Sequence, residues 1–284
     1  MYETFYGLKE KPFALTPDPQ FLYPSPQHVM ALTLLEYGLE QHSGFILITG
    51  EVGSGKTTLI RQLLGRIADD VTVGLISNTH RAFGPLMQWV LLAFGLDYKA
   101  KEDAALFQTF TDFLIEEYRR RRRVLLIVDE AQNLGTETLE ELRVLSNINA
   151  DKDFVLQTIL VGQPELRATL RAPAMRQLAQ RISVDYHLKT LARCETYAYV
   201  RHRLEVAGGS PDIIAREAIE FVHGGTGGVP RLINSLCDSA LVYGFAEQRR
   251  TIDAELMAQV IRDRAAGGVL PLVAPETALA SELR

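Results

Sequence analysis

Five short segments dominated by Val, Ile, Leu and Phe recur in the first two thirds of the 284-residue chain. Their apolar residues follow one another with little polar alternation, which is typical of strands buried on both faces of a parallel sheet. The predicted strands are Phe45–Thr49, Val71–Ser77, Val124–Val128, Phe154–Val161 and Ile182–His187. The pattern therefore predicts an α/β fold with a five-stranded parallel sheet.

Helical spacing of apolar residues fills the intervals between these strands. The predicted helices there are Gln27–His42, Lys56–Ile67, Phe83–Phe94, Ala105–Arg122, Thr136–Asn149 and Ala174–Arg181. From residue 191 on, the predicted elements are helices only, at Arg193–Val206, Asp212–His223, Pro230–Ala246 and Asp253–Arg264. We therefore expect an α/β domain over 27–190, a small all-α domain over 191–264 and a flexible tail over 265–284.

A glycine-rich loop joins the first predicted strand to the helix that follows it. Gly50, Gly55, Lys56 and Thr57 match the phosphate-loop pattern G-x-x-x-x-G-K-[ST]. Glycines let successive backbone N–H groups face a common centre, and the helix adds the positive end of its dipole. The lysine supplies charge to the terminal phosphates and the threonine hydroxyl is a Mg²⁺ ligand. The predicted nucleotide site comprises Gly50, Glu51, Val52, Gly53, Ser54, Gly55, Lys56, Thr57 and Thr58.

Two carboxylates, Asp129 and Glu130, follow the third predicted strand. Ligands of open α/β sheets bind at the carboxyl ends of the strands. In a protein with a phosphate loop, the first acid is expected to orient Mg²⁺ and its waters, and the second to polarise the attacking water. An Asp-Glu pair after an apolar run is also a common helix cap, but its place after the loop favours the catalytic interpretation.

Three features allow two interpretations each. Gln163 ends the fourth predicted strand, where it is placed either to bond the attacking water or γ-phosphate or to form a turn before the next helix. The proline- and aromatic-rich segment 1–26 is expected to extend over the α/β domain, either as plain packing or to hold the adenine. The run Arg119–Arg123 fits nucleic acid or acidic lipid, but cations at a helix C-terminus are the favoured interpretation.

Composition narrows the class of protein. Apolar residues make up 47% and charged residues 23%, which is ordinary for a globular protein, and the formal charge of −5 gives no global preference for nucleic acid. Cys194 and Cys237 lack metal-binding spacing, so reduced thiols are expected. The sequence shows neither a signal peptide nor an apolar run long enough for a membrane span, which predicts a soluble cytoplasmic protein.

Taken together, these motifs resemble those of AAA+ ATPases with a helical lid, over roughly residues 1–264. Five stretches are more closely similar to the general-secretion-pathway protein A (ExeA) ATPases and the related ATPases of exosortase and exopolysaccharide loci: Met1–Asp18, Gly50–Thr58, Val128–Leu134, Gly162–Leu166 and Gly228–Asn234. Transposition-helper ATPases of the TnsC/TniB kind are more distant. Secretion-branch proteins continue into a transmembrane helix and a periplasmic peptidoglycan-binding domain, whereas this sequence ends in a short tail, which favours the exosortase and exopolysaccharide branch.

The resemblance assigns roles to the residues of the two strongest motifs. Lys56 and Thr57 match the Walker A ligands of phosphate and Mg²⁺. Asp129 and Glu130 match the Walker B motif, with Glu130 as the water activator. ATP and Mg²⁺ are accordingly the expected substrate and cofactor.

The resemblance also extends to residues outside the two Walker motifs. Gln163 stands at the sensor-1 position, and Arg231, in Gly-Val-Pro-Arg, resembles the sensor-2 arginine of the lid, although a surface arginine at a helix start is an alternative. Arg176 or Arg181 resembles the arginine finger that is offered to a neighbouring subunit's ATP. The sequence does not choose between these two, and either arginine could instead pair with a surface acid.

The function implied by the resemblance is Mg²⁺-dependent hydrolysis of ATP by a homo-oligomeric ring or filament. Its partner would belong to an envelope, secretion or exopolysaccharide system. The alternative is an ATP-gated DNA-binding regulator of the transposition-helper kind, which the run Arg119–Arg123 would serve. A nucleotide-binding scaffold without turnover is disfavoured by intact Lys56, Asp129 and Glu130.

Overall fold

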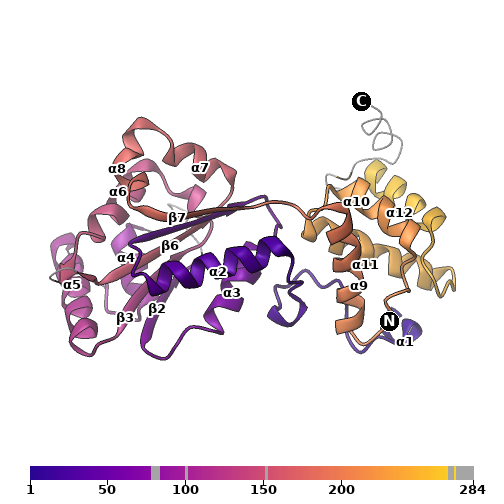
Figure 1. Ribbon diagram of the computed structural model, residues 1–284, viewed down its shortest axis with the longest axis horizontal. Coiled ribbons are helices and arrows are strands. Elements are labelled where there is room, and N and C mark those ends of the chain that lie inside the picture. The colour runs from indigo at the N-terminus through magenta and orange to yellow at the C-terminus, as the bar shows by residue number, and fades with distance from the viewer. Residues whose placement is uncertain (78–83, 100–101, 151–152, 268–271, 273–284) are drawn as a thin grey trace. The chain divides into compact units, whose positions relative to one another are not determined.

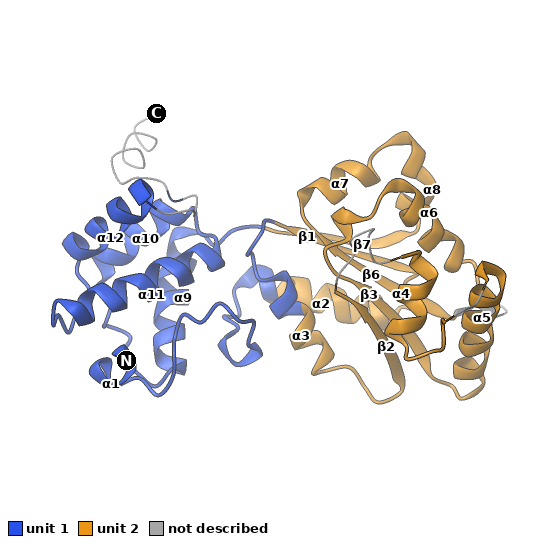
Figure 2. Cartoon of the chain, turned by 180° about the vertical axis from the view of Figure 1, so that it is seen from behind, with its two compact units in different colours: residues 1–28, 51–59, 189–284 blue, residues 29–50, 60–188 orange. Residues whose placement is uncertain are grey.

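The computed structural model describes the chain except for residues 78–83, 100–101, 151–152, 268–271 and 273–284. The chain forms two compact units, each assembled from segments that are far apart in the sequence (Figure 2). Unit 1 contains residues 1–28, 51–59 and 189–284, and unit 2 contains residues 29–50 and 60–188. Most of the predicted tail lies outside the described residues, and residues 265–267 belong to the last helix, α12 (Ala254–Gly267).

Unit 2 is built on the five-stranded parallel sheet that the apolar segments predict (Figure 1). In spatial order the strands are β2 (Val71–Ile76), β3 (Arg123–Val128), β6 (Leu156–Gly162), β1 (Phe45–Gly50) and β7 (Ile182–Leu188). β6 begins two residues later than predicted, because β5 (Asp153–Phe154) pairs antiparallel with β4 (Asn149–Ala150) instead. The predicted fold class is confirmed.

The helices of unit 2 cover both faces of this sheet. β1 is buried along its whole length, so its alternate side chains pack against opposite layers. Phe45 and Leu47 join a core cluster with residues from α4 to α8. On the other face, a Cβ on Gly38 of α2 would lie 2.6 Å from Cδ1 of Ile46, so glycine there permits close packing. These helices are α2 (Pro26–Glu40), α3 (Lys56–Leu64), α4 (Leu86–Ala93), α5 (Asp103–Arg119), α6 (Thr136–Leu145), α7 (Pro164–Leu170) and α8 (Arg176–Ala179).

Several predicted helices of unit 2 have other bounds in the structure, and the one predicted over Thr136–Asn149 ends at Leu145, since Asn149 lies in β4. The helix predicted over Ala174–Arg181 is only the short α8, preceded by the 3₁₀ turn η4 (Pro173–Met175). Pro173 fits at the first position of such a turn, since it lacks the N–H that a helix interior requires. The helix predicted from Phe83 begins at Leu86 in the structure, and Phe83 itself lies outside the described residues.

Unit 1 is the all-α part of the chain. Its helices are α1 (Tyr2–Tyr6), α9 (Arg193–Val206), α10 (Arg216–Thr226), α11 (Pro230–Ala246) and α12. The segment 1–26, predicted to be extended and to pack on the α/β domain, instead places Tyr2, Tyr6, Phe13 and Phe21 in the apolar core of these helices. It also begins with the helix α1 and contains the 3₁₀ turn η1 (Pro19–Phe21), because its prolines begin only at residue 12 and leave the first turns free to be helical.

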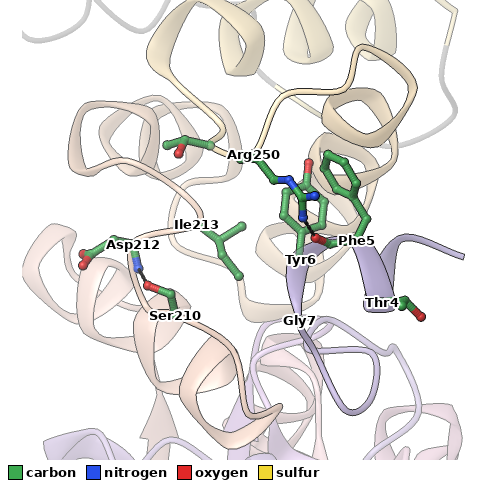
Figure 3. A pocket seen from close by; sticks show the side chains of 9 residues that line it. Thr4, Phe5, Tyr6, Gly7, Ser210, Asp212, Ile213 and Arg250 are labelled. Atoms are coloured by element: carbon green, nitrogen blue, oxygen red, sulfur yellow. Dashed lines mark hydrogen bonds between the residues drawn. The ribbon is translucent and has the colours of Figure 1, made fainter.

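A hollow of about 490 Å³ lies beside this N-terminal segment (Figure 3). Its lining comes from α1 and from the connections before α10 and α12, and consists of Thr4, Phe5, Tyr6, Gly7, Ser210, Asp212, Ile213, Arg250 and Thr251. The guanidinium of Arg250 lies 4.0 Å from the centre of the Phe5 ring and donates a hydrogen bond to the Phe5 carbonyl oxygen. The hollow therefore lies where the N-terminal segment packs against the connections before α10 and α12. Within the described residues, no helix combines the length and apolar character required to cross a bilayer.

A buried arginine holds the same segment to α9. Arg203 is only 6% exposed, and its Nε donates a hydrogen bond to the carbonyl oxygen of Pro12 at 2.6 Å. Its two terminal nitrogens donate to the Tyr199 hydroxyl at 2.9 Å and to the Ala14 carbonyl at 3.3 Å. The guanidinium also lies 4.7 Å from the centre of the Phe21 ring. One side chain thus satisfies several buried acceptors of the N-terminal segment.

We expect Arg203→Met to lower the free energy of unfolding of unit 1 by about 2–4 kcal/mol, because buried carbonyl oxygens lose their donor. Arg201→Met on the same helix is the matched control, since Arg201 pairs with the exposed Asp212 and should contribute under about 1 kcal/mol. Urea unfolding followed by circular dichroism measures both losses. Equal losses in the two variants would contradict the role given to Arg203.

Candidate active site

The predicted phosphate loop joins β1, which ends at Gly50, to α3, which begins at Lys56. Gly53 has a φ of 79° and Gly55 a φ of 100°, a region that residues with side chains rarely adopt. Space is limited as well, because a Cβ on Gly55 would lie 2.9 Å from Nε2 of His28. Backbone conformation and close neighbours therefore both require glycine at these two positions.

His28, which the sequence analysis does not single out, supports this loop. Its side chain is 6% exposed, with Nε2 3.2 Å from the carbonyl oxygen of Ser54 and Nδ1 2.8 Å from Oγ of Ser25. Burial lowers the pKa of His28, so the imidazole is neutral at pH 7. A lone histidine after Pro-Gln carries no sequence signal for such a contact.

Arg231 approaches the loop from the first turn of α11. Its backbone N–H donates a hydrogen bond to the Gly53 carbonyl oxygen at 3.2 Å. A Cβ on Gly53 would lie 2.4 Å from Cβ of Arg231, so the two backbones can approach only because residue 53 is glycine. Arg231 is exposed. The structure thus places this predicted residue directly against the phosphate loop.

The residues of the loop fit a phosphate group. Oγ of Ser54 is buried and has no hydrogen-bond partner among the described residues, as expected for a donor that serves a ligand. Lys56 is 6% exposed, and its ammonium donates to the Glu51 carbonyl oxygen at 2.8 Å, which keeps the charge at the loop. Thr57 lies in the first turn of α3, and its hydroxyl is a hard oxygen donor of the kind that binds Mg²⁺.

The two predicted carboxylates lie at the edge of the sheet in unit 2. Asp129 follows β3, is 8% exposed, and its backbone N–H donates to the Ile76 carbonyl oxygen at 2.8 Å. Its Oδ1 accepts a hydrogen bond from the backbone N–H of Glu130 at 2.9 Å. Glu130 has a φ of 53°, a left-handed conformation that is uncommon for a residue with a long side chain. Such strained backbone often marks a functional position.

Two glutamines hold the side chain of Glu130. Oε2 of Glu130 accepts a hydrogen bond from Nε2 of Gln163 at 3.2 Å and a second from Nε2 of Gln132. Gln132 also accepts the backbone N–H of Gln163 at 3.1 Å, so the three side chains form one network. The structure therefore brings Gln163 to Glu130. Gln132, which sequence reasoning did not select, enters because the 3₁₀ turn η3 (Ala131–Asn133) folds it back toward the acid.

The two candidate arginine fingers differ in what they contact. Nη1 of Arg181 donates to Oγ of Ser146 at 2.6 Å, and Nη2 donates to Oδ1 of Asn147. Arg181 therefore ties β7 to the end of α6. Arg176 begins α8 and is exposed, and its guanidinium has no hydrogen bond or ion pair with any described residue. Of these two candidates, Arg176 is the one without a hydrogen bond or ion pair to a described residue.

The arginine run at the end of α5 is largely paired. Four of its members contact acids: Arg119 and Arg120 pair with Glu116, Arg120 and Arg122 with Glu117, and Arg123 with Asp70. The pairs with Glu116 and Asp70 are exposed and worth little to stability, whereas Glu117 is buried, and all of these acids partly neutralise the patch. The geometry supports the interpretation of the run as cations at a helix C-terminus.

Comparison with known proteins gives a clear relative. The chain is 43% identical to General secretion pathway protein A of Aeromonas hydrophila over 249 residues, which are 87% of this chain and 45% of that protein. The chain thus spans about half the length of this curated relative. Residues 39–170, which contain both Walker motifs, match the family described as AAA domain.

Solved structures share the fold. The ORC2 protein of Aeropyrum pernix, in ADPNP-ADP complexes, has a TM-score of 0.65 at 20% identity, covering 90% of this chain and 72% of that one. Cdc6p from Pyrobaculum aerophilum has a TM-score of 0.67 at 15% identity, covering 87% and 71%. At these low sequence identities, the similarity to the two solved structures shows the fold alone. The AAA-domain match over residues 39–170 and the 43% identity over most of the chain identify an AAA domain that is similar to that of General secretion pathway protein A.

Proposed function

We propose that this chain binds ATP with Mg²⁺ and hydrolyses it to ADP and phosphate. The observation that carries the proposal is the network at the sheet edge, where Gln132 and Gln163 orient the Glu130 carboxylate next to Asp129. A glycine-rich loop with a buried lysine and an unpartnered buried hydroxyl supplies the phosphate-binding half. Both halves are those expected for phosphoryl transfer, in which catalysis is mainly positioning and charge neutralisation.

Each residue has a distinct task in this proposal. Lys56 and the loop N–H groups stabilise the negative charge of the phosphates, and Arg231 adds a cation from the helical unit. The hydroxyl of Thr57 and the carboxylate of Asp129 are hard oxygen ligands of the kind that hold Mg²⁺. When bound, Mg²⁺ neutralises charge that develops on the phosphate oxygens.

The network of Glu130, Gln132 and Gln163 positions and activates the attacking water. Glu130 is the acceptor that orients the water and takes on its proton, which is general-base catalysis. Gln163 donates to the same carboxylate, so it fixes the rotamer of Glu130 and offers an amide to the γ-phosphate. Gln132 donates to the Glu130 carboxylate and accepts the backbone N–H of Gln163, so it restrains the position of both residues.

A phosphate-release assay on the purified chain tests this function. We expect steady ATP turnover with Mg²⁺ and loss of at least about 100-fold when EDTA removes the metal, because the charge of the triphosphate is then uncompensated. Restoring Mg²⁺ should restore the rate. No phosphate release with Mg²⁺ at any protein concentration would contradict the proposed reaction.

Hydrolysis is further proposed to depend on a second copy of the chain, with Arg176 as the arginine provided in trans. The support is that Arg181 is engaged with Ser146 and Asn147 whereas Arg176 is exposed and uncommitted among the described residues. An arginine supplied in trans is worth about 10³-fold or more in other nucleotide hydrolases. Assembly into a ring or filament would then control the rate.

Mixing two inactive variants tests this dependence. Arg176→Ala should lower kcat by about 10³-fold, because its own site lacks the partner's cation, while Glu130→Gln keeps Arg176 intact. A mixture of the two should recover activity, since each Arg176→Ala site can receive an arginine from a Glu130→Gln neighbour. Arg181→Ala is the matched control and should change stability more than turnover. Full activity of Arg176→Ala, or a mixture no faster than its parts, would contradict the assignment.

The process served is proposed to be an envelope system for secretion or exopolysaccharide export. The support is the 43% identity to General secretion pathway protein A, together with the sequence resemblance to exopolysaccharide-locus ATPases. Deleting the gene, and complementing it with the wild type or Glu130→Gln, tests whether ATP turnover is required for secreted protein or surface polysaccharide. Arg120, Arg122 and Arg123, which follow α5, are paired with acids and give no support to a DNA-binding role.

A further inference from the structure

His28 occupies the first turn of α2 and contacts the phosphate loop through its ring. Nε2 lies 3.2 Å from the Ser54 carbonyl oxygen, which can only accept, so Nε2 carries the proton. In the neutral ring Nδ1 is then an acceptor, and the Ser25 hydroxyl donates to it at 2.8 Å. The Ser54 carbonyl oxygen therefore sets the tautomer in which His28 donates to the loop, and the Ser25 hydroxyl holds the ring in place by bonding Nδ1.

This hydrogen bond determines how one peptide of the loop is turned. In a planar trans peptide the carbonyl oxygen and the following N–H point in opposite directions. Holding the Ser54 oxygen toward His28 therefore directs the N–H of Gly55 away from the imidazole. A phosphate nest requires consecutive N–H groups that face the anion and carbonyl oxygens that face away from it.

The neighbouring carbonyl oxygens of the loop are held as well. The Gly53 oxygen accepts the backbone N–H of Arg231 at 3.2 Å, and the Glu51 oxygen accepts the Lys56 ammonium at 2.8 Å. The side chain of His28 holds the carbonyl oxygen of Ser54 in the same way. Its ring is buried, and only a glycine at position 55 makes room for it, since a Cβ there would lie 2.9 Å from Nε2.

We propose that His28 is a positioning residue of the phosphate loop, which holds the Ser54–Gly55 peptide in the orientation that binds the phosphates of ATP. This inference rests on the proposed ATP-binding function. His28 does not take part in the hydrolysis step. Its effect is therefore expected in the affinity for ATP and ADP, and in KM rather than kcat.

Three variants test the proposal. His28→Met keeps a side chain of similar size but removes the hydrogen-bond donor. It should weaken ATP binding about tenfold or more, which corresponds to the loss of one hydrogen bond that holds the loop. His28→Gln keeps an N–H near the position of Nε2 and should bind within about threefold of the wild type. Ser25→Ala removes the hydroxyl that bonds Nδ1 and orients the ring, and should weaken binding about threefold.

Calorimetric titration with ATP and Mg²⁺ gives the affinities, and hydrogen exchange of the nucleotide-free protein gives the loop geometry. We expect faster amide exchange at Gly55 and Lys56 in His28→Met, with protection of β1 unchanged. A purely structural role would give a lower melting temperature with unaltered affinity. Wild-type affinity in His28→Met, or equal losses in His28→Met and His28→Gln, would overturn the proposal.

The outcomes separate this inference from the proposed function. A wild type that does not bind ATP would refute the function itself. A wild type that binds, beside a His28→Met variant that binds equally well, would refute the inference alone. If His28→Met does not fold, Ser25→Ala decides, and its binding ATP as tightly as the wild type would overturn the proposal.

Discussion

Glu130→Gln should lower kcat for ATP hydrolysis by about 10²–10³-fold while ATP affinity stays within about threefold of the wild type. The amide cannot accept the proton of the attacking water, but its size and its place beside Gln132 and Gln163 are kept. Binding depends on the phosphate loop, which this change does not touch. Single-turnover phosphate release and calorimetric titration measure the two quantities separately.

A matched change at Glu137, the next acidic residue in the sequence, separates the role of Glu130 as a base from the loss of one negative charge. Glu137→Gln, on the exposed first turn of α6, also removes one negative charge but should leave turnover unchanged. Gln132→Ala should give an intermediate loss of about tenfold, because Glu130 keeps its carboxylate and loses one of its two amide donors. Normal kcat in Glu130→Gln would exclude Glu130 as the base.

Lys56→Ala should abolish measurable ATP binding, with a loss of affinity of about 100-fold or more. Lys56 is 6% exposed and lies within the loop, so its charge acts in an environment where water screens it poorly. Its ammonium already bonds the Glu51 carbonyl oxygen, which holds the cation at the site before a ligand arrives. Fluorescence anisotropy with a labelled ATP analogue measures the loss.

The control for this variant is another lysine of the same chain. Lys99→Ala removes an equal charge from an exposed position and should bind ATP like the wild type. Lys56→Arg should recover little, since a planar guanidinium does not replace a compact ammonium in a tight loop. Equal affinities of Lys56→Ala and Lys99→Ala would show that the loop is not a phosphate site.

The central strands β1, β3 and β6 were predictable because each is buried on both faces and is therefore almost entirely apolar in sequence. β1 and β3 lie within a residue of their predicted bounds. The fourth strand was displaced because the sequence does not show that Phe154 pairs in a hairpin with Asn149. Similarly, the helix predicted over 174–181 begins only at Arg176, because Pro173 starts a 3₁₀ turn that extends to Met175.

The N-terminal segment shows what local patterns cannot supply. Its prolines and aromatic residues correctly indicate a segment anchored by side chains, but not what it is anchored to. That depends on Arg203, more than 180 positions away, whose buried guanidinium accommodates the Pro12 and Ala14 carbonyl oxygens. A buried arginine cannot be told from a surface arginine in a helix such as α9 by periodicity alone.

The residues of the candidate site likewise fall into those that sequence motifs predict and those that only the fold brings together. The residues of the phosphate loop, Asp129 and Glu130 follow from motifs, because their chemistry needs those types at fixed spacing. His28 and Gln132 act through contacts with backbone and side chains that the fold alone brings near, so no spacing rule selects them. The choice between Arg176 and Arg181 likewise needed the contacts of Arg181 with Ser146 and Asn147.

The central claim is that this chain holds one ATP with Mg²⁺ at its glycine-rich loop. Isothermal titration calorimetry of the full chain with ATP, in the presence and absence of Mg²⁺, tests it most directly. We predict saturable heat with one nucleotide per chain, tighter with Mg²⁺ than without it. No heat of binding, together with a melting temperature that ATP and Mg²⁺ leave unchanged, would contradict the account.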